Sequence, residues 1–193
     1  MLRGLFLAAP GAGKGTQGPR LAELHGVPYI STGDMLRQHV ADGTELGQAA
    51  QSYMARGELA PDELVVAMVR DRITSPTPLA GFVLDGFPRT IHQAEAAYEW
   101  GRGRGTTFHA VISLEVPEEE LLHRVRERQK ATGRADDDVD TFKNRLVVYA
   151  QETQPLIEFY RQRGILLVID GTGEVAEVAA RIDAAVAELD LDG

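Results

Sequence analysis

Short apolar runs without a polar residue at every second position recur along the chain, at residues 5–9, 82–84 and 165–169. Runs of this kind are typical of parallel strands that are buried on both faces of a sheet. Further strand patterns cover 27–30 and 110–115. The pattern therefore predicts a parallel sheet enclosed by helices, an α/β sandwich, with no internal repeat and no separate second domain.

Helical patterns fill the segments between these strands. The first begins near Lys14 and ends before Gly26, a residue that suits the position after a helix. Gly18 and Pro19 fit this helix poorly, and Pro19 lies beyond the first turn, so we expect a slight kink or a late helix start. Other helices are predicted over 61–73, 91–102 and 174–189, and around Arg124 and Arg145.

Residues 31–60 combine short helical patterns and weak apolar content with four glycines: Gly33, Gly43, Gly47 and Gly57. A segment with few apolar contacts opens at low free-energy cost. We therefore expect this region to form a small lobe that moves.

Composition limits the class of protein. The 193 residues are 44% hydrophobic and 25% charged, which is ordinary for one globular domain. The absence of cysteine excludes disulfides and cysteine-ligated zinc, and the five histidines lack the spacing of metal ligands. No apolar run approaches the ~20 residues of a membrane span, and 5–9 is too short for a secretory signal, so we expect a cytoplasmic protein.

The net charge of −9 argues against non-specific binding to nucleic acid or anionic lipid, because both are polyanions. Any polyanion must then meet a local cluster of cations. The basic residues are 17 arginines and 3 lysines; guanidinium groups suit phosphate, although a codon bias toward arginine is an alternative explanation. No exposed apolar stripe stands out, so we expect a monomer.

The clearest chemistry lies in a glycine-rich turn after the first apolar run, Ala8-Ala9-Pro10-Gly11-Ala12-Gly13-Lys14-Gly15-Thr16. Its glycines let backbone N–H groups converge on an anion, and the following helix adds the positive end of its dipole. Lys14 would reach the outer phosphates of a nucleotide, and Thr16 offers a hydroxyl to Mg²⁺. The alternative is a turn that is rich in glycine for packing reasons, with Lys14 solvated.

This turn departs from the strict P-loop pattern at two positions. Ala8 stands where the pattern has its first glycine, and Gly15 separates Lys14 from the hydroxyl residue Thr16. Because Ala8 lies at the exit of a strand, outside the tight part of the turn, we expect its φ to be negative.

A carboxylate and an arginine follow the second apolar run, as Asp85 and Arg89. In P-loop proteins a carboxylate at a strand end near the loop holds Mg²⁺ directly or through water. The alternative for Asp85 is a turn former before Gly86. Farther on, Arg124 and Arg128 share one helical face, where they repel each other unless an anion lies there, the alternative being a solvated basic stripe.

Together these segments resemble the adenylate kinases, in order and along essentially the whole chain. The resemblance rests on the glycine-rich turn, Ser31-Thr32-Gly33-Asp34-Met35-Leu36-Arg37, Leu84-Asp85-Gly86-Phe87-Pro88-Arg89-Thr90, Arg124 with Arg128, Arg134-x-Asp136-Asp137, and Arg145. It implies a P-loop three-layer sandwich on a five-stranded parallel sheet. The implied core is 1–30, 61–126 and 138–193, with an AMP-binding lobe at 31–60 and a short lid at 127–137.

The resemblance also implies roles for individual residues. ATP would be held by Gly11, Ala12, Gly13, Lys14, Gly15, Thr16, Arg124, Arg128 and Gly173. AMP would be held by Thr32, Arg37, Glu58, Leu59, Ala60, Gly86, Arg89, Gln93, Arg134 and Arg145. The catalytic residues would be Lys14, Arg37, Arg89, Arg128, Arg134 and Arg145. Thr16 and Asp85 would hold Mg²⁺, largely through water and the phosphates. Asp136 and Asp137 would belong to the hinge of the lid.

The implied reaction is reversible, Mg²⁺-dependent phosphoryl transfer from ATP to AMP, with no zinc because the lid lacks an insert and the chain lacks cysteine. Its transition state is loose and spreads charge, so the site must align the substrates and neutralise charge, and we expect no general base. One alternative is a UMP/CMP kinase or another nucleoside monophosphate kinase, which would differ in the base pocket. Another is a nucleotide sensor without turnover, which does not need arginines from four segments.

Overall fold

The computed structural model describes residues 1–74, 79–132 and 137–189. Five parallel strands form one sheet in these ranges, in the order β2-β3-β1-β4-β5. The strands are β1 (Arg3–Leu7), β2 (Tyr29–Ser31), β3 (Phe82–Asp85), β4 (Ala110–Glu115) and β5 (Leu166–Asp170). The predicted α/β class and the five-stranded parallel sheet are thereby confirmed.

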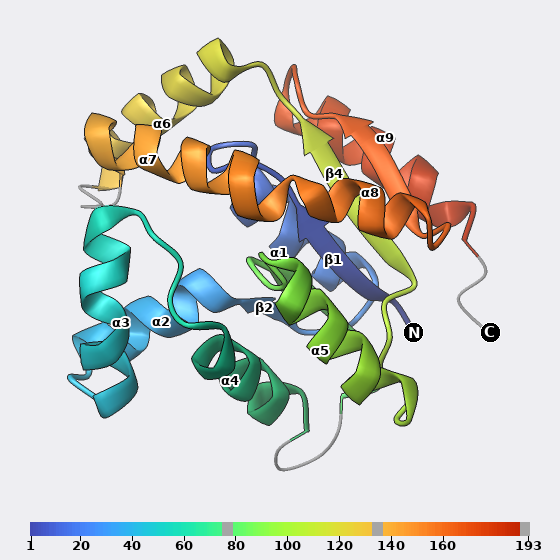
Figure 1. Ribbon diagram of the computed structural model, residues 1–193. Coiled ribbons are helices and arrows are strands. Elements are labelled where there is room, and N and C mark those ends of the chain that lie inside the picture. The colour runs from blue at the N-terminus through green and yellow to red at the C-terminus, as the bar shows by residue number, and fades with distance from the viewer. Residues whose placement is uncertain (75–78, 133–136, 190–193) are drawn as a thin grey trace.

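Helices cover both faces of the sheet (Figure 1). They are α1 (Lys14–Leu24), α2 (Thr32–Ala41), α3 (Glu45–Arg56), α4 (Asp62–Thr74), α5 (Ile91–Arg102), α6 (Glu118–Thr132), α7 (Val139–Val148), α8 (Pro155–Arg161) and α9 (Val175–Ala187). A π-helical segment, η2 (Tyr149–Thr153), joins α7 to α8, so that the three form one continuous rod across the sheet (Figure 1). No pattern in the sequence indicates this wider turn.

The alternation of side chains along β1 explains the three layers. Phe6 packs with α1 and α9 on one face, whereas Leu5 and Leu7 pack with α4 and α8 on the other. All three side chains are at most 2% exposed. A strand that is apolar on both faces shows no period-two alternation, which is the pattern that predicted a doubly covered sheet.

The first helix differs from one of the expectations. It begins at Lys14 and continues through Pro19, so the expected late start is wrong. The helix ends before Gly26, whose φ of 62° places it in the left-handed region after the last turn, as predicted.

The strand order brings the polar segments together at one edge. β1 lies between β3 and β4, and Phe6 of β1 pairs with Asp85 of β3, so the turn after β1 and the segment after Asp85 leave the sheet side by side. Ligands of open α/β sheets bind at such a point, outside the carboxyl ends of the strands. Of the helices in the described ranges, none has the length and apolar character that crossing a membrane requires.

Candidate active site

The turn after β1 has the geometry of an anion cradle. Gly11 and Gly13 have φ values of 88° and 102°, which favour glycine. A side chain on Gly11 would also come within 2.9 Å of Val125 on α6. No residue other than glycine has a positive φ in the described ranges, so the prediction of a negative φ at Ala8 is confirmed.

Lys14 begins α1 and folds back across this turn. Its Nζ donates hydrogen bonds to the carbonyl oxygens of Ala8 at 2.7 Å and Ala9 at 3.0 Å. Burial lowers the pKa of Lys14 to about 8, while the nearby carboxylate of Asp85 raises it. The ammonium lines the cleft, and within the described residues it donates only these two hydrogen bonds, both to main-chain carbonyls, so the alternative of a solvated lysine does not describe this residue.

The segment after β3 is held by hydrogen bonds to the main chain. Thr32 is 1% exposed, and its hydroxyl donates to the carbonyl oxygen of Gly86 at 2.8 Å. Gly86 has a φ of 82°, and a side chain there would meet Thr32 and the guanidinium of Arg89. Gly86 therefore lies in close contact with both Thr32 and the guanidinium of Arg89.

Arg89 is fixed by bonds from three directions. Its Nε donates to the carbonyl oxygen of Gly86 at 2.8 Å, and its backbone N–H donates to Oε1 of Gln93 at 2.8 Å. Its carbonyl oxygen accepts from the hydroxyl of Thr153 at 2.9 Å, and Thr153 lies in η2. Gln93 is 1% exposed and in turn donates through Nε2 to Asp62 at 2.7 Å.

Asp62 and Thr153 support the site although the sequence does not mark them as part of it. The sequence places Asp62 only in the first turn of a helix, and nothing around Thr153 distinguishes it. Both reach Arg89 or Gln93 across long separations along the chain, 31 residues for Asp62 and Gln93 and 64 for Thr153 and Arg89.

The arginines of α6 and α7 have carboxylate partners. Arg128 donates to both carboxylate oxygens of Asp137 at 2.6 Å, and Arg145 reaches the same carboxylate at 3.4 Å. The side chain of Asp137 is 0% exposed. Arg124 bonds to Glu120 at 2.7 Å and to the carbonyl oxygen of Gly171 at 3.1 Å. Carboxylates thus offset the repulsion for which the sequence argument required an anion.

Two predicted residues of the lobe pair locally. Arg37 forms an ion pair with Asp34 one turn earlier on α2. Glu58 pairs with Arg56 at 2.7 Å, although both side chains are largely exposed. The lobe also touches α7, because Asn144 donates to the carbonyl oxygen of Arg56 at 2.6 Å.

One cleft of about 810 Å³ collects most of the predicted residues. Its size is typical of a small-molecule site. Asp137 lies behind Arg128 rather than on the wall, and Arg134 and Asp136 fall outside the described residues. The predicted residues on the wall are Gly11, Ala12, Gly13, Lys14, Gly15, Thr16, Thr32, Arg37, Glu58, Leu59, Ala60, Asp85, Gly86, Arg89, Gln93, Arg124, Arg128, Arg145 and Gly173.

Comparison with known proteins identifies the family of the chain. A family model described as adenylate kinase matches residues 6–165, most of the chain. The chain belongs to the adenylate kinase family. It is 47% identical over 180 residues to an adenylate kinase from Thermobifida fusca, with 93% of this chain and 95% of the relative covered.

Two further adenylate kinases are about equally similar. Adenylate kinase 1 of Synechocystis is 47% identical over 184 residues, with 95% of this chain and 96% of the relative covered. An adenylate kinase of Thermus thermophilus is 46% identical over 182 residues, with 94% of this chain and 95% of the relative covered. The resemblance that the motifs indicated is therefore confirmed.

Adenylate kinases are nucleotide kinases that generally use Mg²⁺, and the donors of this cleft fit that ion. The described residues contain no group of three or more His, Cys, Asp or Glu side chains that could hold a metal ion. They do offer the hydroxyl of Thr16 and the carboxylate of Asp85 on the cleft wall. A hydroxyl and a carboxylate suit Mg²⁺ that keeps several waters and is held mainly by substrate phosphates.

Proposed function

We propose that the protein catalyses reversible phosphoryl transfer from Mg²⁺-bound ATP to AMP, forming two ADP, and so maintains the balance of adenine nucleotides. The observation that carries this proposal is the meeting of Lys14, Arg89, Arg128 and Arg145 on one cleft from separate elements. A sensor that only binds nucleotide needs phosphate contacts at one end. Cations from the turn, from the β3 end and from α6 and α7 suit a phosphoryl group in transit between two substrates.

The strand order supports two subsites on either side of β1. The residues proposed for ATP come from the turn after β1, from α6 and from the connection between β5 and α9, on the β4 and β5 side. Most residues proposed for AMP come from α2, the α3–α4 connection, the segment after β3 and the first turn of α5, on the β2 and β3 side, whereas Arg145 lies on α7. Lys14, at the start of α1, and Asp85, the last residue of β3, lie at the carboxyl ends of the neighbouring strands β1 and β3, between these sets.

The residues of this chain would align the two substrates and stabilise the charge that moves between them. Backbone N–H groups of Gly11 to Thr16 would bind the ATP phosphates, and Arg37 and Arg89 would hold the AMP phosphate. Lys14, Arg128 and Arg145, with Arg134, would stabilise charge on the transferring group. When bound with ATP, Mg²⁺ supplies further positive charge, and Thr16 and Asp85 would hold it, largely through water.

The pocket proposed for the acceptor base has a fixed hydrogen-bonding orientation. The Thr32 hydroxyl proton is directed to Gly86, which leaves the Thr32 oxygen as an acceptor for an exocyclic amine. Asp62 can only accept when ionised, so it directs Nε2 of Gln93 toward itself and Oε1 toward Arg89. This arrangement favours adenine over the alternative of a pyrimidine acceptor, whose edge would leave buried groups unpaired.

We further infer that the lobe at 31–60 and the lid at 127–137, of which 133–136 lie outside the described residues, close over a core formed by 1–30, 61–126 and 138–193. Support comes from the hydrogen bond of Asn144 to Arg56, which links the lobe to the helix after the lid. Closing both parts would exclude water and prevent hydrolysis of ATP. We propose a monomeric cytoplasmic enzyme whose partners are ATP, AMP and ADP, without nucleic acid or membrane.

The test is a coupled assay of phosphoryl transfer from ATP to AMP, CMP, UMP and GMP, with and without EDTA. We expect rapid transfer to AMP, slow transfer to the other acceptors, and loss of transfer in EDTA. Faster phosphorylation of UMP or CMP than of AMP would overturn the acceptor, and undiminished transfer in EDTA would overturn the role of Mg²⁺. Binding of ATP without transfer to any acceptor would favour the sensor.

A further inference from the structure

The glycine inside the helix after the phosphate loop has no part in the proposed function. Gly18 lies in the interior of α1, where glycine costs about 1 kcal/mol relative to alanine. It is buried against the ring of Tyr29 on β2. A side-chain carbon on Gly18 would lie 2.4 Å from Cε2 and 3.0 Å from Cδ2 of that ring, closer than atoms in contact approach. Gly18 therefore makes the space that the tyrosine ring occupies.

The hydroxyl of the same tyrosine reaches the candidate metal carboxylate. Tyr29 Oη donates a hydrogen bond to Oδ2 of Asp85 at 2.9 Å. The two residues come from neighbouring strands, because β2 pairs with β3 and Ser31 lies opposite Asp85. Burial and the charge of Asp85 raise the pKa of Tyr29, so the phenol keeps its proton and acts as the donor.

This bond restricts what the carboxylate can do. A carboxylate at a strand end can rotate about its side-chain bonds, and a donor that occupies Oδ2 fixes the plane of the group. Oδ1 accepts no hydrogen bond from the described residues, and Asp85 lines the cleft, where its charge acts on Lys14. Groups that orient a metal-binding carboxylate in this way tune metal affinity without touching the metal.

We propose that Tyr29 is a positioning residue that orients Asp85 toward the Mg²⁺ of bound ATP, and that Gly18 is present in α1 to admit its ring. This inference rests on the proposed function, since the metal enters with the nucleotide. It explains why a helix that begins at a phosphate loop tolerates a buried glycine. A role confined to packing would require the ring of Tyr29 but not its hydroxyl.

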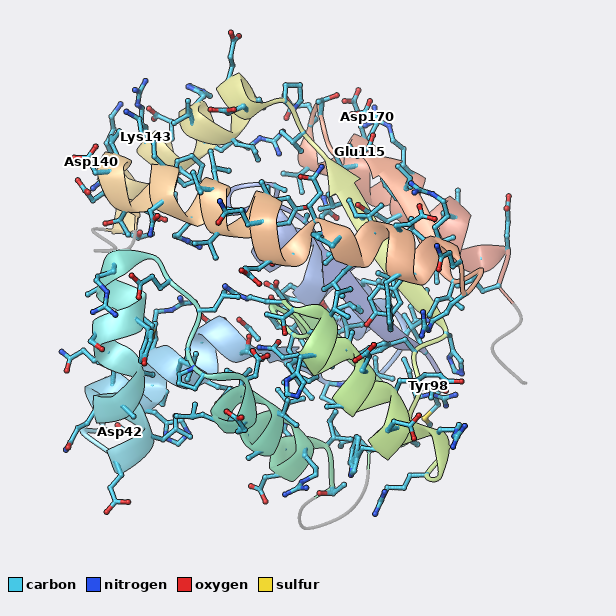
Figure 2. All side chains as sticks on the ribbon, in the orientation of Figure 1. Asp42, Tyr98, Glu115, Asp140, Lys143 and Asp170 are labelled. Atoms are coloured by element: carbon cyan, nitrogen blue, oxygen red, sulfur yellow. The ribbon has the colours of Figure 1, made fainter. Side chains whose placement is uncertain are left out.

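The test separates ring from hydroxyl with Tyr29→Phe, which keeps the ring. Tyr98→Phe is the matched control, because Tyr98 is a 41% exposed residue of α5 that does not line the cleft (Figure 2). The readout is the affinity for Mn²⁺, as a stand-in for Mg²⁺, of the complex of the protein with AMP and a β,γ-imido analogue of ATP. The electron paramagnetic resonance signal of free Mn²⁺ measures it without turnover.

We expect Tyr29→Phe to weaken Mn²⁺ binding about tenfold, the lower end of the effect of removing a group that orients a metal ligand. Binding of the imido analogue in EDTA and the melting temperature should stay close to those of the wild type. Tyr98→Phe should change none of these values. Unchanged Mn²⁺ affinity in Tyr29→Phe, or equal losses with and without metal, would overturn the inference.

Gly18→Ala tests the second half of the proposal. The added methyl group must displace the Tyr29 ring, so we expect the same loss of Mn²⁺ affinity. In the Tyr29→Phe background it should cause no further loss, because the bond to Asp85 is already absent. If Gly18→Ala does not fold, Tyr29→Phe still decides the role of the hydroxyl. Wild-type transfer that persists in EDTA would contradict the proposed function, whereas a wild-type requirement for metal without an effect in Tyr29→Phe would contradict this inference alone.

Discussion

Lys14→Met should lower activity strongly without lowering stability. In the proposed reaction the ammonium of Lys14 would stabilise the transferring phosphate, so its loss should cost about 3 kcal/mol of transition-state stabilisation, or roughly 10²-fold or more in turnover. Most substitutions in a folded protein destabilise it, so a change that removes activity while sparing the fold identifies a group held for function.

The stability of this variant follows from the environment of Lys14. The folded protein depresses the pKa of the ammonium from 10.5 to about 8, which at ~1.4 kcal/mol per pKa unit corresponds to an unfavourable contribution of about 3 kcal/mol. For a lysine with a lowered pKa this contribution is fully present below about pH 8, is lost as the pH rises from about 8 to 10.5, and is absent above that. Methionine removes it at pH 7 but leaves the carbonyls of Ala8 and Ala9 unpaired, at about 1–3 kcal/mol.

We therefore expect the free energy of unfolding of Lys14→Met at pH 7 to equal that of the wild type or to exceed it by up to ~2 kcal/mol, because the two contributions largely cancel. Urea denaturation measures it, alongside a coupled assay of ADP formation. Lys143→Met is the control, since Lys143 is an exposed lysine of α7 (Figure 2). Turnover within tenfold of wild type would refute the role of Lys14, and a loss of stability of several kcal/mol would refute the buried-charge reasoning.

Three other predictions use separate readouts. At pH 8.5, binding of the imido analogue of ATP should be accompanied by proton uptake, because a bound phosphate would raise the pKa of Lys14 above its value of about 8 in the free protein. Calorimetry in two buffers of different ionisation enthalpy should detect this proton uptake, and Lys14→Met should abolish it. Gln93→Leu should raise the Michaelis constant for AMP much more than that for ATP, and equal effects would contradict the base pocket. Burial lowers the pKa of His109, whose Nε2 has no hydrogen-bond partner in the described part of the chain. The free energy of unfolding should therefore fall as the pH drops below about 6.5. In urea titrations at pH 7.5 and 5.5, His109→Gln should reduce this difference in unfolding free energy, and an unchanged difference would contradict the role of His109.

Local pattern was sufficient for the features that depend on neighbouring residues. The uninterrupted apolar runs predicted β1, β3 and β5, and the glycine spacing predicted the turn whose φ values of 88° and 102° the structure contains. The family resemblance supplied the assignment of arginines to one cleft. The expected late start of α1 was wrong, because the helix begins at Lys14 and continues through Pro19.

The supporting contacts could not be predicted, because they depend on which strands become neighbours. Tyr29 and Asp85 are 56 residues apart and meet only since β2 pairs with β3. Thr153 meets Arg89 because the π-helical turn of η2 directs it there. Neither strand order nor a widened helical turn has a signature in the residues immediately around them.

The carboxylate of Asp137 has a consequence for product release. It engages the guanidinium groups of Arg128 and Arg145, the same groups that a phosphate would use. A phosphate that arrives would compete with this carboxylate for the two guanidinium groups, and one that departs would leave the buried carboxylate to pair with them. Such competition makes the net free energy gained on phosphate binding smaller than the strength of an arginine–phosphate ion pair, because each such pair replaces an arginine–carboxylate pair. An enzyme that must release two ADP molecules per cycle benefits from arginines that hold phosphate firmly only while it is being transferred.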